Sequence, residues 1–161
     1  MSVVDLAQEL ADEHVVDFEL IRHRHTESAR AEAAEIGLPG EEVGKTIVLV
    51  GDHGFVRAVI PASERLDLHK VRPLIGCGAC ARLATEEELA GAYPMFELGA
   101  VPPFGGPTGD AAIVDHRLAL LESVVVEAGT HERSVRLPMR DLIRIAEAQI
   151  ADICESGSNG C

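Results

Sequence analysis

The chain has 161 residues, of which 47% are hydrophobic, so it is long and apolar enough to fold around a core of its own. Its formal net charge of −13 argues against nonspecific nucleic-acid binding over the whole surface, and its 3% of aromatic residues provide little material for stacking bases. No apolar run approaches the roughly 18 residues that span a bilayer, and no basic and then apolar signal segment opens the chain, so we expect a soluble, cytoplasmic protein without a membrane contact.

The first half of the chain predicts two helices and a β-hairpin. Apolar residues recur at helical spacing over residues 3–13, and residues 15–21 are typical of a strand. Ser28 is placed to cap a helix over residues 29–36. The clearest unit is residues 45–61, where two β-branched runs flank a short polar turn, and this pattern predicts a hairpin.

The second half predicts further short elements in alternation. A short helix over residues 66–75 is expected to break near Pro73, and Thr85 with Glu88 forms a capping box that opens the next helix. Strands are predicted over residues 111–116, 123–129 and 134–138, followed by an amphipathic helix over residues 139–154.

The order of these elements mixes hairpins with helices. This order favours an α+β fold with a mixed, largely antiparallel sheet flanked by helices, rather than a doubly wound parallel sheet. We expect a single domain over residues 1–154 and a polar, disordered tail over residues 155–161.

A stretch rich in glycine and proline, GAVPPFGGPTG, covers residues 99–109. Its prolines lack amide donors and its glycines permit positive φ, so it cannot continue a strand and predicts a stiff loop poor in side chains. Such a loop serves either as a crossover between sheet edges or as a wall where a ligand approaches the main chain.

The cysteines do not form a recognisable metal motif. Cys77 and Cys80 have the C-x-x-C spacing of a redox pair or of half a zinc site, but no second half is present among the other cysteines and the histidines. We expect reduced cysteines, no metal and no cofactor.

A locally basic segment interrupts the acidic chain. Between residues 57 and 82 the formal charge is +3, which suits either a partner engaged at one point or an ordinary solvated surface. The basic residues that would form such a contact are Arg57, Arg65, Lys70 and Arg72.

Six short segments occur in a defined order: GKTIVLV, VIPASERLDLHKVR, ARLATEEEL, GAVPPFG, IVDHRL and VVVEAGTHERSVRL. Together they resemble the YbaK-type aminoacyl-tRNA editing domain, a family of free-standing deacylases and of editing insertions in bacterial prolyl-tRNA synthetases. The resemblance covers residues 16–153 and implies a barrel-like mixed sheet. It also implies hydrolysis of the ester that joins a wrong amino acid to the terminal adenosine of a tRNA, with tRNA(Pro) carrying Ala or Cys as the expected substrate and a prolyl-tRNA synthetase as a possible partner.

The resemblance places the family's site residues on this chain. The lysine that heads the hairpin falls on Lys45, the G-x-x-x-P loop begins at Gly99, and the aspartate that closes a later strand falls on Asp115. We expect Lys45 to hold a phosphate or the carbonyl oxygen as a cation. Asp115 is expected to contact the substrate α-amine or to support the loop, or else simply to cap the end of its strand. The residues assigned to substrate binding are Thr46, Ala100, Val101, Pro102, Pro103, Phe104 and Gly129. Those assigned to a tRNA-facing surface are the basic residues Arg57, Arg65, Lys70 and Arg72.

An aminoacyl ester is already activated, so its hydrolysis needs a positioned water and a stabilised oxyanion more than a covalent nucleophile. A small, stiff pocket wall would select the amino acid by size. Two other functions stay open: a binding module of the same fold without catalysis, and a thiol redox protein that depends on Cys77 and Cys80.

Overall fold

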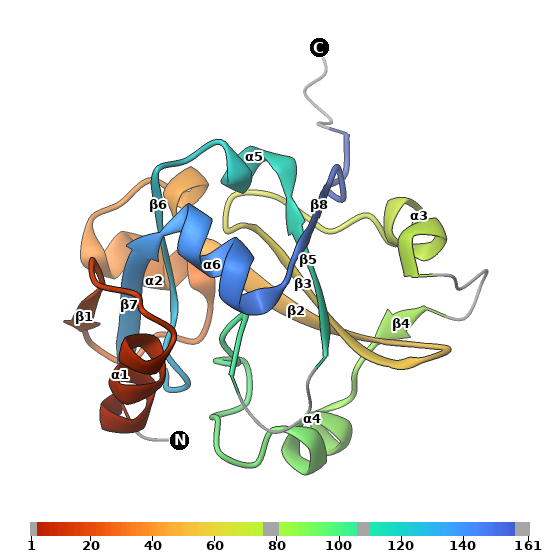
Figure 1. Cartoon of the computed structure of the whole chain (residues 1–161). Helices are drawn as coiled ribbons and strands as arrows, with labels where there is room; N and C mark the ends of the chain where they lie inside the picture. The colour runs from red at the N-terminus through yellow and green to blue at the C-terminus, as the bar shows by residue number, and fades with distance from the viewer. Residues whose placement is uncertain (1–2, 76–80, 106–109, 157–161) are drawn as a thin grey trace.

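The computed structural model describes residues 3–75, 81–105 and 110–156, with the side chains of the first helix described from residue 8 onward. Its strands form two sheets (Figure 1). The three-stranded sheet has the order β1 (Glu19–Arg22), β7 (Arg133–Pro138) and β6 (Ser123–Glu127). The five-stranded sheet has the order β4 (Arg82–Leu83), β2 (Gly44–Gly51), β3 (Gly54–Pro61), β5 (Ala111–Asp115) and β8 (Gln149–Ala151).

The strand pairing is mixed. The pairs β3–β5 and β5–β8 are parallel, and the other pairs among the named strands are antiparallel. The predicted α+β class and mixed, largely antiparallel pairing are therefore confirmed. The barrel is not closed: the two sheets remain separate, and an isolated bridge between Val43 and Val125 links them where β2 begins beside β6.

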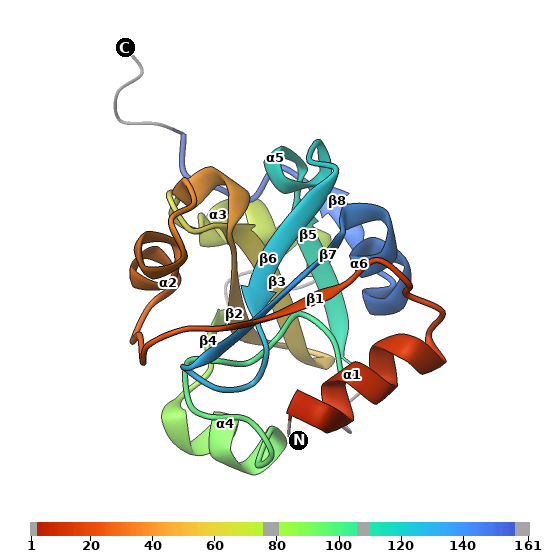
Figure 2. The same cartoon turned by 90° about the vertical axis from the view of Figure 1, so that its left-hand side faces the viewer.

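Helices cover both faces of the three-stranded sheet, which stands between them in Figure 2. On one face, α2 (Ala29–Ile36) packs its Ala29 and Ala33 against Val125 of β6. On the other face lie α1 (Val3–Asp12) and α6 (Met139–Ala146), which share a hydrophobic cluster with Val124 and Val126. Successive side chains of a strand point to opposite faces, and helices cover both faces of β6. For this reason β6 is apolar along nearly its whole length.

Local sequence signals set several boundaries as predicted. Ser28 caps α2 by accepting a hydrogen bond from the Ala31 N–H at 3.1 Å, and Gly37 ends that helix at φ 75°. Thr85 and Glu88 form the capping box of α4 (Glu86–Ala92).

Three short helical segments complete the fold. The predicted short helix is α3 (Leu68–Val71), which continues into the 3₁₀ turn η2 (Arg72–Ile75) at Pro73. The others are η1 (Gly40–Glu42) and α5 (His116–Ala119).

The helix predicted over residues 139–154 is wrong in its second half. Glu147 takes up a left-handed conformation, with φ 49° and ψ 46°, and ends α6. The chain then pairs in parallel with the free edge of β5 as β8. Ile150 is 48% exposed, and Ile153 packs with Ile113 in a hydrophobic cluster other than the one that α6 joins. The apolar residues that were spaced like one face of a helix therefore belong to a strand and a loop.

Two further segments differ from expectation or lie partly outside the structure. The strand predicted from residue 15 begins only at Glu19, and Val16 is 83% exposed. In the predicted tail, the Glu155 N–H donates to the Arg65 carbonyl at 2.8 Å, and residues 157–161 lie outside the described residues. No helix in the described part of the chain has the length and apolar character needed to cross a membrane.

Candidate functional site

A cavity of about 210 Å³ lies where the two sheets meet. Four segments that are distant in the sequence line it: the first residues of β2, the N-terminus of α2, the Gly/Pro loop and the end of β6. The described lining residues are Glu27, Ser28, Ala29, Gly44, Lys45, Thr46, Ile47, Gly99, Val101 and Glu127. The fold thus brings together Lys45, Thr46, Gly99 and Val101 of the predicted site.

Lys45 lines this cavity near the start of β2 and is half-buried. Its Nζ donates to the Glu64 carbonyl at 3.2 Å, and no carboxylate among the described residues lies within 4.0 Å of it. Burial, together with the neighbouring Arg30 and Arg65, lowers the pKa of the Lys45 ammonium. The ammonium keeps donors to spare, so it can bind an anionic or carbonyl oxygen.

Gly99 also lines the cavity, in a conformation that favours glycine, with φ 82°. A Cβ there would lie 3.3 Å from Cε1 of His131. The main chain of the loop therefore borders the cavity directly, while the Ala100 N–H is used within the loop by the Glu97 carbonyl at 3.0 Å.

The buried side chain of Arg57 holds the same loop in place by hydrogen bonds. The side chain of this β3 residue is 4% exposed; its Nε donates to Asp110 at 3.0 Å and its Nη1 to the Pro102 carbonyl at 2.9 Å, while Nη2 donates to the Gly105 carbonyl. The assignment of Arg57 to a tRNA-facing surface is therefore wrong. The guanidinium is a structural clamp that fixes the turn after Val101, a role that five donors in a planar fork suit.

The proline-rich part of the loop is buried rather than exposed to the cavity. Pro102, Pro103 and Phe104 do not line it; Phe104 instead packs into the cluster beneath α1 and α6. Ala100 is fully buried as well. Gly99, Val101, Ile47 and Ala29 line this cavity, and the substrate contact expected of Pro102, Pro103 and Phe104 stays a prediction.

Asp115 lies away from the cavity and caps α5. Its carboxylate accepts hydrogen bonds from the N–H groups of Ile153 and Arg117, each at 3.0 Å. Burial alone would raise the pKa of Asp115, but these N–H donors bring it below the usual value. Of the predicted roles the structure supports the strand-end cap, and the carboxylate is not placed to touch a ligand in the cavity.

Gly129 supports the loop from the turn between β6 and β7. It has φ 92°, and a Cβ there would lie 2.9 Å from Phe96. Its carbonyl accepts from the Glu97 N–H at 2.8 Å, just before Gly99. Gly129 thus positions the loop without lining the cavity.

Glu127 is a site residue that the sequence analysis missed. It ends β6, its side chain is 9% exposed, and its Oε2 has no hydrogen-bond partner although Nδ1 of His131 lies 3.8 Å away. Burial, and then the carboxylates of Glu32, Glu97 and Glu27, raise its pKa to about 9. A carboxylate inside the otherwise apolar run VVVEAG was the available signal.

The remaining basic residues are distributed unevenly around the site. Arg65 is exposed near Lys45, as is Arg30, which the sequence analysis did not single out. Lys70 is engaged by Asp152 at 3.1 Å and by the Cys154 carbonyl at 2.7 Å. Arg72 lies against His69, with 3.4 Å between Nη1 and Nδ1.

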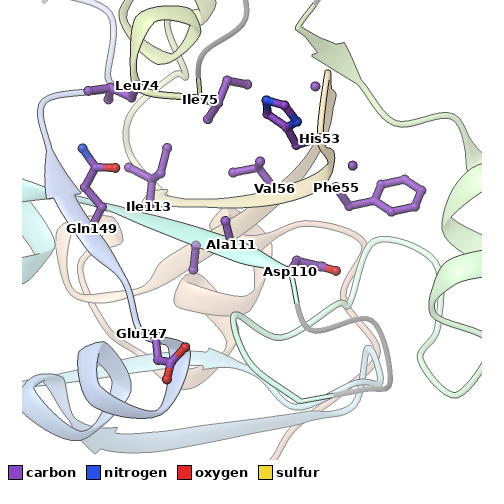
Figure 3. A pocket seen from close by; sticks show the side chains of 13 residues that line it. His53, Phe55, Val56, Leu74, Ile75, Asp110, Ala111, Ile113, Glu147 and Gln149 are labelled. Carbon is purple, nitrogen blue, oxygen red and sulfur yellow. The ribbon is translucent and has the colours of Figure 1, made fainter.

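A larger cavity of about 690 Å³ lies at the turn end of the β2–β3 hairpin, where Val56, Leu74, Ile75 and Ile113 surround it (Figure 3). None of the predicted site residues lines it. Its polar lining residues are Asp110, which Arg57 already holds, and His53, Glu147 and Gln149.

The cysteines carry no chemistry in the described part of the chain. Cys77, Cys80 and Cys161 lie outside the described residues. Cys154 is a free, buried thiol whose pKa is raised to about 12 by burial and by Asp115. Such a thiol stays protonated and unreactive near neutral pH.

Comparisons with known proteins show similarity in sequence and in fold. Residues 23–145 match the family described as the aminoacyl-tRNA editing domain. A crystal structure of a candidate trans-editing enzyme for prolyl-tRNA synthetase is 27% identical, with a TM-score of 0.85 over 97% of this chain and 99% of that one. A scaffold protein for epitope grafting by computational design is 23% identical, with a TM-score of 0.86 over 98% of this chain and 100% of the other, and shares the fold. The hypothetical protein APE2540 does so as well, at 24% identity and a TM-score of 0.84 over 96% of this chain and 100% of that one.

Proposed function

The chain belongs to the aminoacyl-tRNA editing domain family, and we propose on that basis that it is a free-standing deacylase that hydrolyses the ester of a mischarged tRNA. The observation that carries the proposal is the cavity at the sheet junction, which Lys45 and Gly99 of the predicted site both line. The similarity to a candidate trans-editing enzyme for prolyl-tRNA synthetase supports tRNA(Pro) carrying Ala or Cys as the substrate.

Lys45 acts as a cation in this proposal. Its ammonium binds the 3′-terminal phosphate or the ester carbonyl oxygen, where negative charge develops as water attacks. The N-terminus of α2 opens onto the same cavity through Ser28 and Ala29, and the positive end of a helix adds to the attraction for an anion. Exposed Arg30 and Arg65 beside Lys45 extend this basic side toward the preceding nucleotides.

The Gly/Pro loop holds the other side of the ester. Because Arg57 fixes the carbonyls of Pro102 and Gly105, the main chain at Gly99 and Val101 keeps one position against the cavity. A preorganised main chain costs no rearrangement when the tetrahedral intermediate forms. Water needs only to be placed against the ester carbon, and no covalent intermediate is involved.

The size of the cavity limits the amino acid. A volume of about 210 Å³ corresponds to roughly seven water molecules at about 30 Å³ each, which suits a small aminoacyl group and excludes a nucleotide. Ile47, Ala29 and Val101 provide an apolar wall for a side chain of the size of alanine or cysteine. For a difference of one methylene, such a wall provides a preference of about 10-fold to 200-fold.

The test is deacylation of tRNAs charged with Ala, Cys, Ser and Pro by the wild type and by Lys45→Ala. We expect fast loss of at least one mischarged species and a rate about 100-fold lower or more in the variant, the range found when one charge-stabilising donor is removed. Arg140→Ala is the matched control, because this exposed arginine of α6 lies on the opposite face of the three-stranded sheet from α2. Failure to accelerate any of the four, with tRNA binding intact, would favour a binding module of the same fold.

A further inference from the structure

Glu127 lines the cavity, and one oxygen of its buried carboxyl lacks a hydrogen-bond partner in the described part of the chain. The residue is 7% exposed, and the unpaired oxygen is Oε2. Buried polar atoms in folded proteins are nearly always paired, and leaving one unpaired costs stability. An unpaired buried oxygen at a cavity wall therefore points to a partner that arrives with a ligand.

The surroundings of Glu127 favour a cationic partner. Glu32 of α2, Glu97 of the preceding loop and Glu27 all raise its pKa by their charges. Glu32 is itself fully buried, accepts from the Ser134 hydroxyl, and keeps its Oε1 unpartnered. The described group within 4.0 Å that could carry positive charge is His131, whose Nδ1 lies 3.8 Å from Oε2 without a hydrogen bond.

Lys45 does not neutralise this end of the cavity. Lys45 and Glu127 both line it, but Nζ is bonded to the Glu64 carbonyl and lies more than 4.0 Å from the Glu127 oxygens. The cavity therefore has a cationic and an acidic side that do not meet. A ligand with an anionic or carbonyl end and a cationic end, a few bonds apart, complements both.

We propose that Glu127 binds the α-amine of the aminoacyl group, so that the site accepts esters with a free α-amine and rejects N-blocked ones. This inference rests on the proposed deacylase function. At the aminoacylated end of a tRNA the phosphates are anionic and the ribose hydroxyls neutral, so for a small uncharged amino acid the α-amine is the cationic group. With Lys45 on the phosphate or carbonyl oxygen, the amine is the group left to face Glu127. The contact with the α-amine that the sequence analysis considered for Asp115 is thereby assigned to a different residue.

The proton balance of this contact is simple. In the free protein the raised pKa, about 9, keeps Glu127 protonated near neutral pH. An α-amine has an ordinary pKa of about 8, so a substantial neutral fraction is available at pH 7 to 8. When the neutral amine enters, the Glu127 O–H bond breaks and an N–H bond forms. The result is an ammonium–carboxylate pair, with no net charge added to the cavity.

The experiment compares Ala-tRNA with N-acetyl-Ala-tRNA as substrates of the wild type and of Glu127→Gln. We expect the wild type to prefer the free amine by about 10-fold to 100-fold, the range for a hydrogen bond between charged groups. The variant should lose most of that preference, with kcat/KM for the free amine falling and that for the acetylated ester unchanged. Equal hydrolysis of both esters by the wild type, or an equal loss on both in the variant, would overturn the inference.

Glu132→Gln is the matched control, because it removes an exposed carboxyl that neither lines the cavity nor is among the groups that raise the pKa of Glu127. It should keep the preference for the free amine. A second measurement separates this inference from the proposed function: calorimetric binding of the amide-linked analogue 3′-alanylamino-3′-deoxyadenosine, free and N-acetylated. If no ester is hydrolysed, the deacylase proposal fails, while tighter binding of the free amine that Glu127→Gln abolishes still supports the amine contact, and equal binding refutes it.

Discussion

Replacing Arg57 with methionine should loosen the loop that borders the cavity. The substitution keeps much of the side-chain volume but removes the donors to Asp110, Pro102 and Gly105. Both members of the ion pair are nearly inaccessible, at 4% and 3% side-chain exposure, so the change leaves an uncompensated carboxylate in the interior. Breaking a buried pair in this way costs about 3–5 kcal/mol.

Two features place the expected cost near the lower end of that range. The Tyr93 hydroxyl still donates to Asp110, and burial already raises the pKa of that carboxyl, so it can become protonated when Arg57 is absent. We therefore expect a loss of about 3 kcal/mol in the free energy of unfolding. With a urea m-value of about 2 kcal/mol/M, the midpoint falls by about 1.5 M.

The assay is urea unfolding followed by circular dichroism, with Arg140→Met as the exposed control, which should change stability by no more than about 0.5 kcal/mol. The double variant Arg57→Met/Asp110→Asn should be more stable than the sum of the two single losses predicts, because it removes the orphaned charge. At urea concentrations below its unfolding midpoint, Arg57→Met should also deacylate mischarged tRNA more slowly than the wild type. A loss under about 1 kcal/mol, or additivity in the double variant, would refute the clamp.

Two further predictions concern the cavity wall. Gly99→Ala places a Cβ 3.3 Å from His131 at φ 82°, so it should cost about 1–2 kcal/mol of stability and reduce kcat/KM by about 10-fold or more; wild-type kinetics would contradict the assigned wall. The pKa of Glu127 rises from 4.5 to about 9 on folding, so its contribution to stability is complete below pH 4.5 and is lost as the pH rises toward 9. Between these two pH values the free energy of unfolding of the wild type should fall by up to about 1.4 kcal/mol per pH unit relative to that of Glu127→Gln. Urea unfolding of both proteins at pH 5, 6.5 and 8 measures this difference. Parallel pH profiles would show that Glu127 is ionised when folded.

Much of the fold could be predicted because its signals are local. Ser28 and Gly37 at the ends of α2, and Thr85 with Glu88 at α4, each act within a few residues of their own position. The end of α6 was different. Residues 147–151 leave the helix because β5 has a free edge for a parallel strand, and no local pattern in that segment reports an edge formed more than thirty residues earlier.

The candidate site could be predicted only in part, again because some of its contacts join residues that are distant in the sequence. Lys45 and Gly99 carry the family resemblance and do line the cavity. Arg57 looked like a surface charge because its partner Asp110 lies 53 residues away, so its burial depends on how the loop folds back over β3. Glu127 ends an apolar strand, and its importance follows only once both faces of β6 are known to be covered.

The most direct test of the account is the single-turnover rate of Ala-tRNA(Pro) deacylation by the wild type and by Lys45→Ala at saturating protein. We expect rapid hydrolysis by the wild type and a rate about 100-fold lower or more in the variant, with unchanged unfolding midpoints. Equal rates in the two proteins would contradict the role of Lys45 and, with it, the assignment of the cavity at the sheet junction as the active site.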